Sequence, residues 1–248
     1  MGLIDSQLAK WATAFSGCDG GDIGSPQSKS IWFCGIEWGG GHPDDELELR
    51  DIFTEDVGKP AVGYIDDDGV PAWRANLAYI FNWQAMKLFA AIHGQQVSTY
   101  KSFAEEVKPF VKNERGYYKL NLYPLAFRNT SHQLWQDGFA KATGFERKQE
   151  YIDWIRSHRF PIMKSWTQSY APKLIICAGI TYSSDFRMAF VDEGLDFNRE
   201  THDDRELQWV VNKNGTTVVV IPFMVNRNGL TRNVSIQKFG DRIREIIS

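Results

Sequence analysis

Two polar side chains lie in or directly after apolar runs that are predicted to form strands. Glu37 follows the run 31–36, "IWFCGI", and precedes three consecutive glycines, and Asn121 lies within the run 117–125, "YYKLNLYPL". A carboxylate can stabilise positive charge that develops on a substrate, and it can orient a water molecule. A carboxamide presents a donor and an acceptor side by side, which matches the paired groups on a pyrimidine edge. Glu37 and Asn121 are therefore the first candidates for a site.

The elements that would position these side chains follow from the apolar pattern. Four short apolar runs are typical of parallel strands buried on both faces. They cover residues 31–36, 117–125, 174–180 and 218–223. Helical patterns lie between and after them, at 72–93, 146–158, 161–170, 182–190 and 235–248. Strands that alternate with helices predict a three-layer α/β/α sandwich around a mostly parallel four-stranded central sheet.

Two further elements are predicted near the ends of the chain. Residues 207–212 and 216–221 flank Asn214-Gly215, a pair that readily takes positive φ, so the last strand is expected to be entered through a hairpin. Residues 5–16 predict a helix with Asp5 or Ser6 as its cap. No linker or repeat divides the chain, so residues 1–248 are expected to form a single domain.

The carboxyl ends of the predicted strands should gather polar side chains. In an open parallel sheet, ligands bind in the crevice beyond these ends, where helix N-termini also point. The residues that follow or end the four runs are Glu37 and Trp38, then Asn121, Tyr123 and Arg128, then Thr181, Tyr182, Ser183 and Ser184, and finally Asn226, Arg227 and Asn228. A carboxylate, a carboxamide, a hydroxyl-rich helix start and a basic loop are therefore predicted at one edge.

The order of these motifs resembles a known family. The chain shows a strand followed by "GIEWGG", then "NLYPL", then "PKLIICAGI" before a helix, and then "VVVIPF" before a polar loop. This order and spacing, over roughly residues 30 to 235, is similar to that of the uracil-DNA glycosylase superfamily. The resemblance implies a uracil-DNA glycosylase-like domain that flips a base out of DNA and hydrolyses its glycosidic bond without a cofactor.

The resemblance also implies roles for individual residues. Glu37 falls where the family has the residue that acts on water or on the sugar, and Asn121 falls where an Asn reads the flipped base. Because cleavage of an N-glycosidic bond develops positive charge on the sugar, a carboxylate facing C1′ suits that place. Trp38 or Tyr123 could stack on the extruded base. The implied DNA-contacting residues are Thr181, Ser183, Asn226, Arg227, Asn228 and Arg232.

The chain departs from the family at two motifs. Trp38 stands where the first motif usually has Pro, and "IPFMVN" replaces a last motif that usually begins with His-Pro-Ser or Asn-Pro-Ser. The His that would stabilise the leaving base is absent, which points to a modified base, in repair or in defence against phage, or to an inactive relative. A non-catalytic nucleic-acid-binding protein and a nucleoside or nucleotide hydrolase are the alternatives.

The composition indicates which partners and which cellular compartment to expect. The net charge is −3, so no global positive field recruits a polyanion. The three cysteines show no CxxC spacing and two lie in apolar runs, which favours a reducing, cytoplasmic setting. His42, Asp44 and Asp45 lack a second His at a ligand spacing, so no metal is expected. We expect a monomer with no cofactor, no secretion signal and no membrane span.

Charge is distributed unevenly along the chain. Residues 44–68 contain ten acidic and two basic residues, so this segment is not expected to lie along a phosphate backbone. Residues 141–173 carry seven basic and three acidic residues, and residues 219–248 carry five and two. If DNA is the partner, the two basic stretches are expected to contact it.

Overall fold

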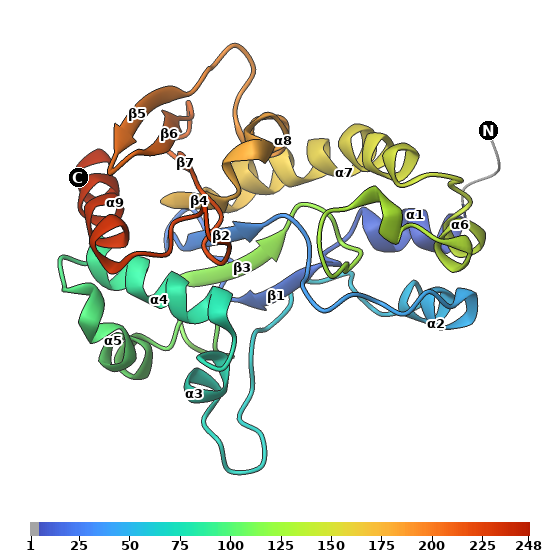
Figure 1. Ribbon diagram of the computed structural model, residues 1–248, viewed down its shortest axis with the longest axis horizontal. Helices are drawn as coiled ribbons and strands as arrows, with labels where there is room; N and C mark the ends of the chain where they lie inside the picture. The colour runs from blue at the N-terminus through green and yellow to red at the C-terminus, as the bar shows by residue number, and fades with distance from the viewer. Residues whose placement is uncertain (1–4) are drawn as a thin grey trace.

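The computed structural model describes residues 5–248 as an α/β fold with one mixed sheet of seven strands in the order β1-β3-β2-β4-β7-β6-β5 (Figure 1). The strands are β1 Cys18–Gly21, β2 Ile31–Gly35, β3 Tyr117–Asn121, β4 Leu174–Ala178, β5 Asn198–His202, β6 Arg205–Val211 and β7 Thr217–Ile221. The four predicted strands are adjacent as β3-β2-β4-β7, and all pair in parallel. The parallel centre of the sheet is therefore confirmed.

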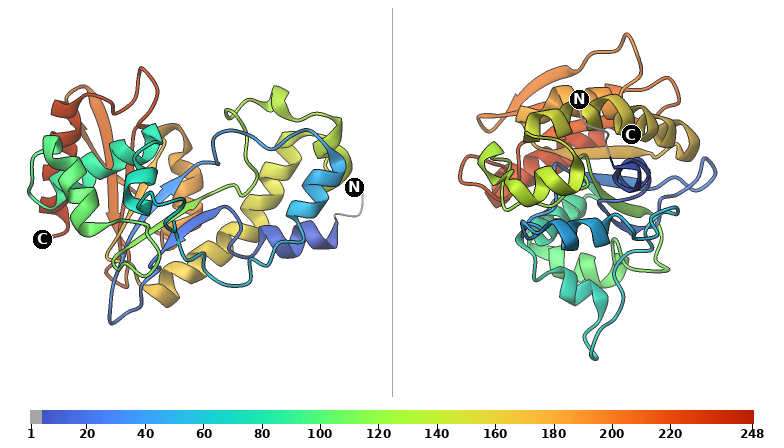
Figure 2. Two further views of the ribbon diagram at one scale, coloured as in Figure 1. Left: turned by 90° about the horizontal axis from the view of Figure 1, so that it is seen from below. Right: turned by 90° about the vertical axis from the view of Figure 1, so that its right-hand side faces the viewer.

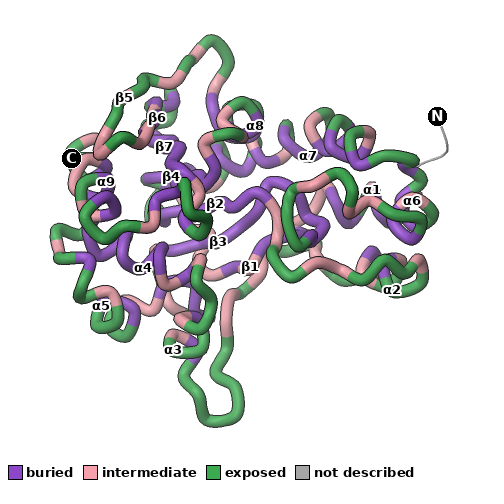
Figure 3. Tube along the Cα trace, viewed as in Figure 1, coloured by how far each residue is buried: buried purple, intermediate pink, exposed green. Residues whose placement is uncertain are grey.

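The expectation of a four-stranded sheet was wrong, because antiparallel strands are added to the sheet beyond β3 and beyond β7. β1 pairs with β3, and β6 and β5 continue from β7. β6 and β7 form the predicted hairpin around Asn214-Gly215. The central strands are buried at every position, whereas β5, "NRETH", has no buried residue and β1, "CDGG", ends in two glycines (Figure 3). Edge strands of this composition carry no strong apolar signal.

The described helices are α1 Ser6–Ala12, α2 Glu46–Ile52, α3 Ala72–Asn76, α4 Ile80–Ile92, α5 Tyr100–Val107, α6 Asp137–Thr143, α7 Lys148–Tyr170, α8 Ser183–Phe190 and α9 Asn233–Ile246. Short 3₁₀ turns lie at η1 Val97–Thr99, η2 His132–Leu134 and η3 Ile180–Tyr182. The Asp5 side chain caps α1 by accepting from the backbone of Gln7 and Leu8, as predicted. Among residues 5–248, no helix combines the length and apolar character needed to cross a membrane.

Two predicted helix boundaries were wrong. The pattern at 72–93 is divided into α3 and α4, because Tyr79 takes an extended backbone. The patterns at 146–158 and 161–170 form one helix, α7, with Pro161 inside it. Proline removes a helical hydrogen bond. Here Phe160 and Met163 are buried on either side of the proline, and this packing offsets the loss.

The two faces of the sheet bury separate apolar clusters, which makes three layers. Trp32 and Cys34 of β2 pack with residues of α1, α2, α6, α7 and α8, whereas Ile31 and Phe33 pack with residues of α4, α5 and α9. This alternation is what a strand buried on both faces requires. Figures 1 and 2 show α1, α2 and α6 together at one end of the molecule and α9 at the other. The parallel strands point toward the α1, α2 and α6 end (Figure 1).

Candidate active site at the carboxyl edge of the sheet

The ends of β2 and β3 bring Glu37 and Asn121 to the same edge of the sheet. Gly35 is the ladder partner of Asn121, and Glu37 follows two residues later. Backbone bonds continue beyond the ladder, from Tyr123 N to the Ile36 carbonyl at 2.9 Å and from Phe127 N to the Trp38 carbonyl at 3.1 Å. The two segments therefore leave the sheet side by side.

The Glu37 carboxylate lies in a buried ion pair with Lys148, the first residue of α7. Lys148 Nζ is 3.2 Å from Oε2 and 3.4 Å from Oε1, and only 2% of the lysine side chain and 6% of the glutamate side chain are exposed. The same ammonium lies 3.7 Å from the centre of the Phe127 ring, a cation–π arrangement. This ion pair thus links the segment after β2 to the start of α7.

Burial changes the ionisation of both partners. Loss of solvent raises the pKa of Glu37 to about 7, although the Lys148 ammonium acts in the opposite direction. Burial also lowers the pKa of Lys148, while Glu37 opposes that change. A carboxyl group with a pKa near 7 exchanges its proton at neutral pH, as a general acid or base must. Strongly perturbed ionisable groups are typical of functional sites, although structural ion pairs also show them.

The Asn121 carboxamide is fixed by its surroundings. The side chain is 3% exposed, and its Nδ2 donates to the Gly17 carbonyl at 3.1 Å, which also accepts the backbone N–H of Asn121 at 3.0 Å. Gly35 is required beside it, because a Cβ there would overlap Asn121 Oδ1. This geometry selects one orientation of the amide, with Oδ1 against β2.

Arg159 of α7 holds the segment that carries Gly17. Its guanidinium is completely buried and donates to the carbonyls of Leu122, Ala12, Ala14 and Ser16 at 2.6 to 3.0 Å. Leu122 directly follows Asn121, so one side chain ties α7 to the end of β3 and to the turn after α1. Arginine suits this place, because its planar fork offers five donors.

Trp38 and Tyr123, the predicted stacking residues, each have another partner in the structure. The half-buried Trp38 donates from Nε1 to Asp19 Oδ2 at 3.0 Å. Tyr123 is buried, and its hydroxyl donates to Asp185 Oδ2 at 2.7 Å; Arg156 also binds this carboxylate. Burial and the Asp185 charge raise the pKa of Tyr123. Tyr123 thus links the segment after β3 to α8 and, through Asp185 and Arg156, to α7.

An aromatic ring that the sequence pattern does not single out lies beside Asn121. Phe81, in the first turn of α4, is half-buried, and its Cε1 lies 3.8 Å from the position of a Cβ on Gly35. The ring also stacks with Phe223, after β7, at 5.5 Å between centroids. Phe81 lies within the amphipathic pattern 72–93, where one aromatic residue among many gives no distinguishing signal.

The loop after β4 also reaches this edge. Gly179 has a φ of +144°, and a Cβ on it would lie 2.8 Å from Ile36 Cδ1, so the chain after β4 passes close to the residue before Glu37. Thr181 is exposed in η3, and Ser183 is half-buried at the start of α8. Both of these predicted DNA contacts therefore lie at the same edge as Glu37.

The loop after β7 presents the polar tip predicted from the sequence. Residues Asn226, Arg227 and Asn228 are all exposed. The Leu230 N–H donates to the Phe223 carbonyl at 2.9 Å, which closes the loop at its base. The tip is therefore held by the backbone, while its side chains are open to solvent.

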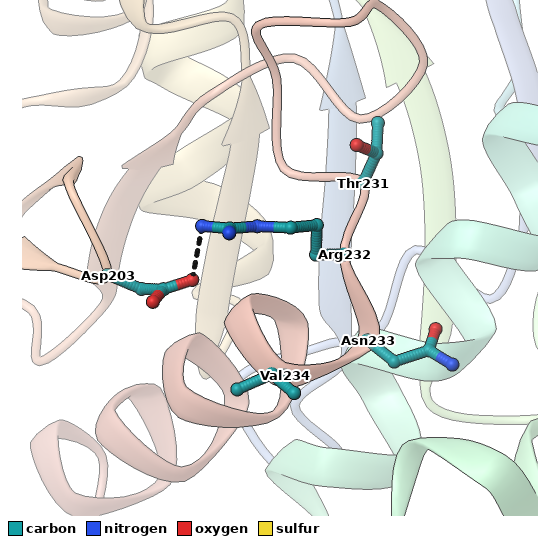
Figure 4. A pocket seen from close by; sticks show the side chains of 5 residues that line it. All are labelled: Asp203, Thr231, Arg232, Asn233 and Val234. Carbon is teal, nitrogen blue, oxygen red and sulfur yellow. Dashed lines mark hydrogen bonds and ion pairs between the residues drawn. The ribbon is translucent and has the colours of Figure 1, made fainter.

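Arg232, the last predicted DNA contact, pairs with a carboxylate. Its Nη2 lies 2.8 Å from Asp203 Oδ2, in the turn between β5 and β6 (Figure 4). A pocket of about 560 Å³ surrounds this ion pair, and a second of about 520 Å³ is lined by Tyr64, Trp73 and neighbouring residues. Neither pocket contains Glu37 or Asn121, and both side chains are largely buried, so the groups covering them must move before a substrate reaches either one.

Part of the basic stretch 141–173 is buried or paired within the protein. Lys148 and Arg159 are buried, and Arg147 and Arg156 pair with Glu150 and Asp185. The charges of Lys148 and Arg159 are therefore inside the protein, whereas Lys141, Arg147 and Lys173 are exposed. In the other basic stretch, Arg227 is exposed in the loop after β7.

No grouping of three or more His, Cys, Asp or Glu side chains among residues 5–248 is placed to hold a metal ion. No known protein-family profile matches the chain, and no curated protein matches it significantly.

Proposed function

We propose that the protein is a DNA glycosylase that flips a modified base out of DNA and hydrolyses its N-glycosidic bond without a cofactor. The observation that carries this proposal is that a buried carboxyl with a pKa of about 7, Glu37, and the Asn121 carboxamide follow adjacent parallel strands at the same end of the sheet, with the carboxyl against α7 and the amide on the side of α4. The motif order that is similar to the uracil-DNA glycosylase superfamily supports the same function.

Each group has a chemical role in the proposal. One N–H of Asn121 donates to Gly17, which leaves the other N–H and Oδ1 to pair with a base edge. Phe81 is placed to stack on that base, a contact that contributes about 1–3 kcal/mol. Glu37 accepts a proton from the water that adds to C1′. The C1′–N bond breaks, the base leaves with its electron pair, and solvent protonates it.

The test is release of free bases from DNA. Duplexes carrying different modified bases are incubated with the protein, and mass spectrometry identifies any base set free. Glu37→Gln keeps the shape of the side chain and is expected to abolish release. Glu200→Gln is the matched control, because Glu200 lies in β5 and pairs with Arg242. Full activity of Glu37→Gln would refute the mechanism.

A non-catalytic nucleic-acid-binding function is the second candidate. It is favoured by the near-complete burial of the Glu37 side chain and by its pairing with Lys148. Such a protein would retard DNA in a gel and leave no abasic site on any duplex after alkaline treatment. Retardation of DNA together with alkali-labile sites would support the glycosylase instead.

A further inference from the structure

A primary amine lies against the carboxyl group that is proposed to act at C1′. Lys148 Nζ is 3.2 Å and 3.4 Å from the two carboxylate oxygens of Glu37, and both side chains are almost completely buried. Lys87 and Lys119 are also buried, but their amines bond to other side chains. A sugar that contacts the Glu37 carboxylate is therefore also within reach of the Lys148 amine.

The position of the amine is fixed by the elements on either side of it. Lys148 is the first residue of α7, a helix of 23 residues, and its Nζ lies 3.7 Å from the centre of the Phe127 ring. The Phe127 N–H in turn donates to the Trp38 carbonyl, next to Glu37. The helix and the segment after β3 thus hold the amine beside the end of β2.

The surroundings favour the uncharged form of this pair. Burial lowers the pKa of Lys148 and raises that of Glu37 to about 7, so both changes favour a neutral amine beside a neutral carboxyl group. Lys148 also lies at the N-terminus of α7, where the helix dipole disfavours a cation. A neutral lysine amine has a free electron pair and is a nucleophile toward carbonyl carbon.

The proposed reaction produces such a carbonyl group at this place. Loss of the base leaves an abasic sugar with a hydroxyl on C1′, and ring opening of that sugar turns C1′ into an aldehyde. Glu37 is proposed to act at the same carbon atom. The electrophile and the amine are therefore brought together by the first reaction.

We propose that Lys148 is the nucleophile of a second activity, which cleaves the DNA strand at the abasic site through an imine between Nζ and C1′. The proposal rests on the proposed function, because that function places the sugar beside Glu37. It makes the ion pair a two-residue device, with Lys148 forming the covalent bond and Glu37 moving protons.

The atoms and electrons balance without a cofactor. The Nζ electron pair adds to the aldehyde carbon, and an amine proton passes to the oxygen. The Glu37 carboxyl protonates this hydroxyl, which leaves as water and gives an iminium ion and a carboxylate. The carboxylate takes a proton from C2′, a C2′–C3′ double bond forms, and the C3′–O bond breaks with its electron pair on the departing phosphate. Water then hydrolyses the iminium ion and frees Lys148.

The experiment uses a labelled duplex with a preformed abasic site, so base release is not needed. A denaturing gel follows strand cleavage, borohydride reduction converts the imine to a stable bond, and mass spectrometry of the digested adduct identifies the modified residue. We expect cleavage and an adduct on Lys148. Both should be lost in Lys148→Arg, because a guanidinium stays protonated and forms no imine. Lys173→Arg, an exposed change before β4, should keep both.

Three results would overturn the second activity: no cleavage above that of the duplex alone, an adduct only on other residues, or cleavage and adduct that persist in Lys148→Arg. The adduct is mapped on the unaltered chain, so this test does not depend on how the variant folds. Release of modified bases without an adduct would remove the second activity alone. An adduct on Lys148 with cleavage, but without release of any base, would retain it and remove the glycosylase.

Discussion

At the scale of single residues, the ionisation of Glu37 governs the proposed reaction. The carboxylate form accepts the proton of water, and its pKa is about 7, so base release is expected to rise as the pH increases through about 7. Lys148→Met removes a charge that favours the carboxylate, so the pKa of Glu37 should increase and the inflection should move to higher pH. Single-turnover rates measured against pH test this, and an unchanged inflection would contradict it.

Also at this scale, Gly35 is expected to control Asn121. In Gly35→Ala, the new Cβ overlaps Asn121 Oδ1, so the carboxamide must turn away from its position. We expect weaker binding of DNA that contains the target base, by about 1–3 kcal/mol for a lost polar contact. Gly39→Ala is the matched control, because nothing lies within 4 Å of its added Cβ. Equal effects of both substitutions on affinity would show that Asn121 does not read the base.

At the scale of elements, α7 supports the site through buried side chains from two of its turns. Lys148 meets the end of β2, and Arg159 meets the end of β3. Arg159→Met would remove the guanidinium donor from four carbonyls, so the free energy of unfolding should fall by on the order of 3 kcal/mol or more. Arg147→Met, in the exposed residue before α7, removes only a surface ion pair with Glu150 and should change stability far less. Urea unfolding followed by circular dichroism compares the two variants.

The elements that could be predicted from sequence are those with strong local patterns. The apolar run at 174–180 identifies β4, because a strand buried on both faces needs apolar residues throughout. β5 could not be found, since its polar residues form a strand only through pairing with β6. Pro161 suggested a helix boundary that packing overrides. Local propensity fails where contacts distant in sequence decide the structure.

At the scale of the whole molecule, the candidate site was predictable only in part. The strand order brings Glu37 and Asn121 to one edge, which a parallel sheet makes predictable. Lys148 lies 111 residues after Glu37, and nothing in its local sequence indicates that it is buried. The same applies to the ion pair that joins Asp19 to Lys119. Charge counted along the chain could not separate buried basic residues from those that face solvent.

The overall charge distribution leads to the last prediction. The chain has a net charge of −3, and much of its basic stretch 141–173 is buried or paired, so phosphate contacts should come from few residues. Arg227→Ala removes an exposed charge from the loop after β7 and should reduce the slope of log affinity against log salt by about 1. Arg115→Ala removes an equivalent exposed charge just before β3, at the amino ends of the parallel strands, and should not alter the slope. Anisotropy titrations at several salt concentrations measure the slope for each variant. If Arg227→Ala and Arg115→Ala give equal slopes, DNA does not approach the sheet at the carboxyl ends of its parallel strands.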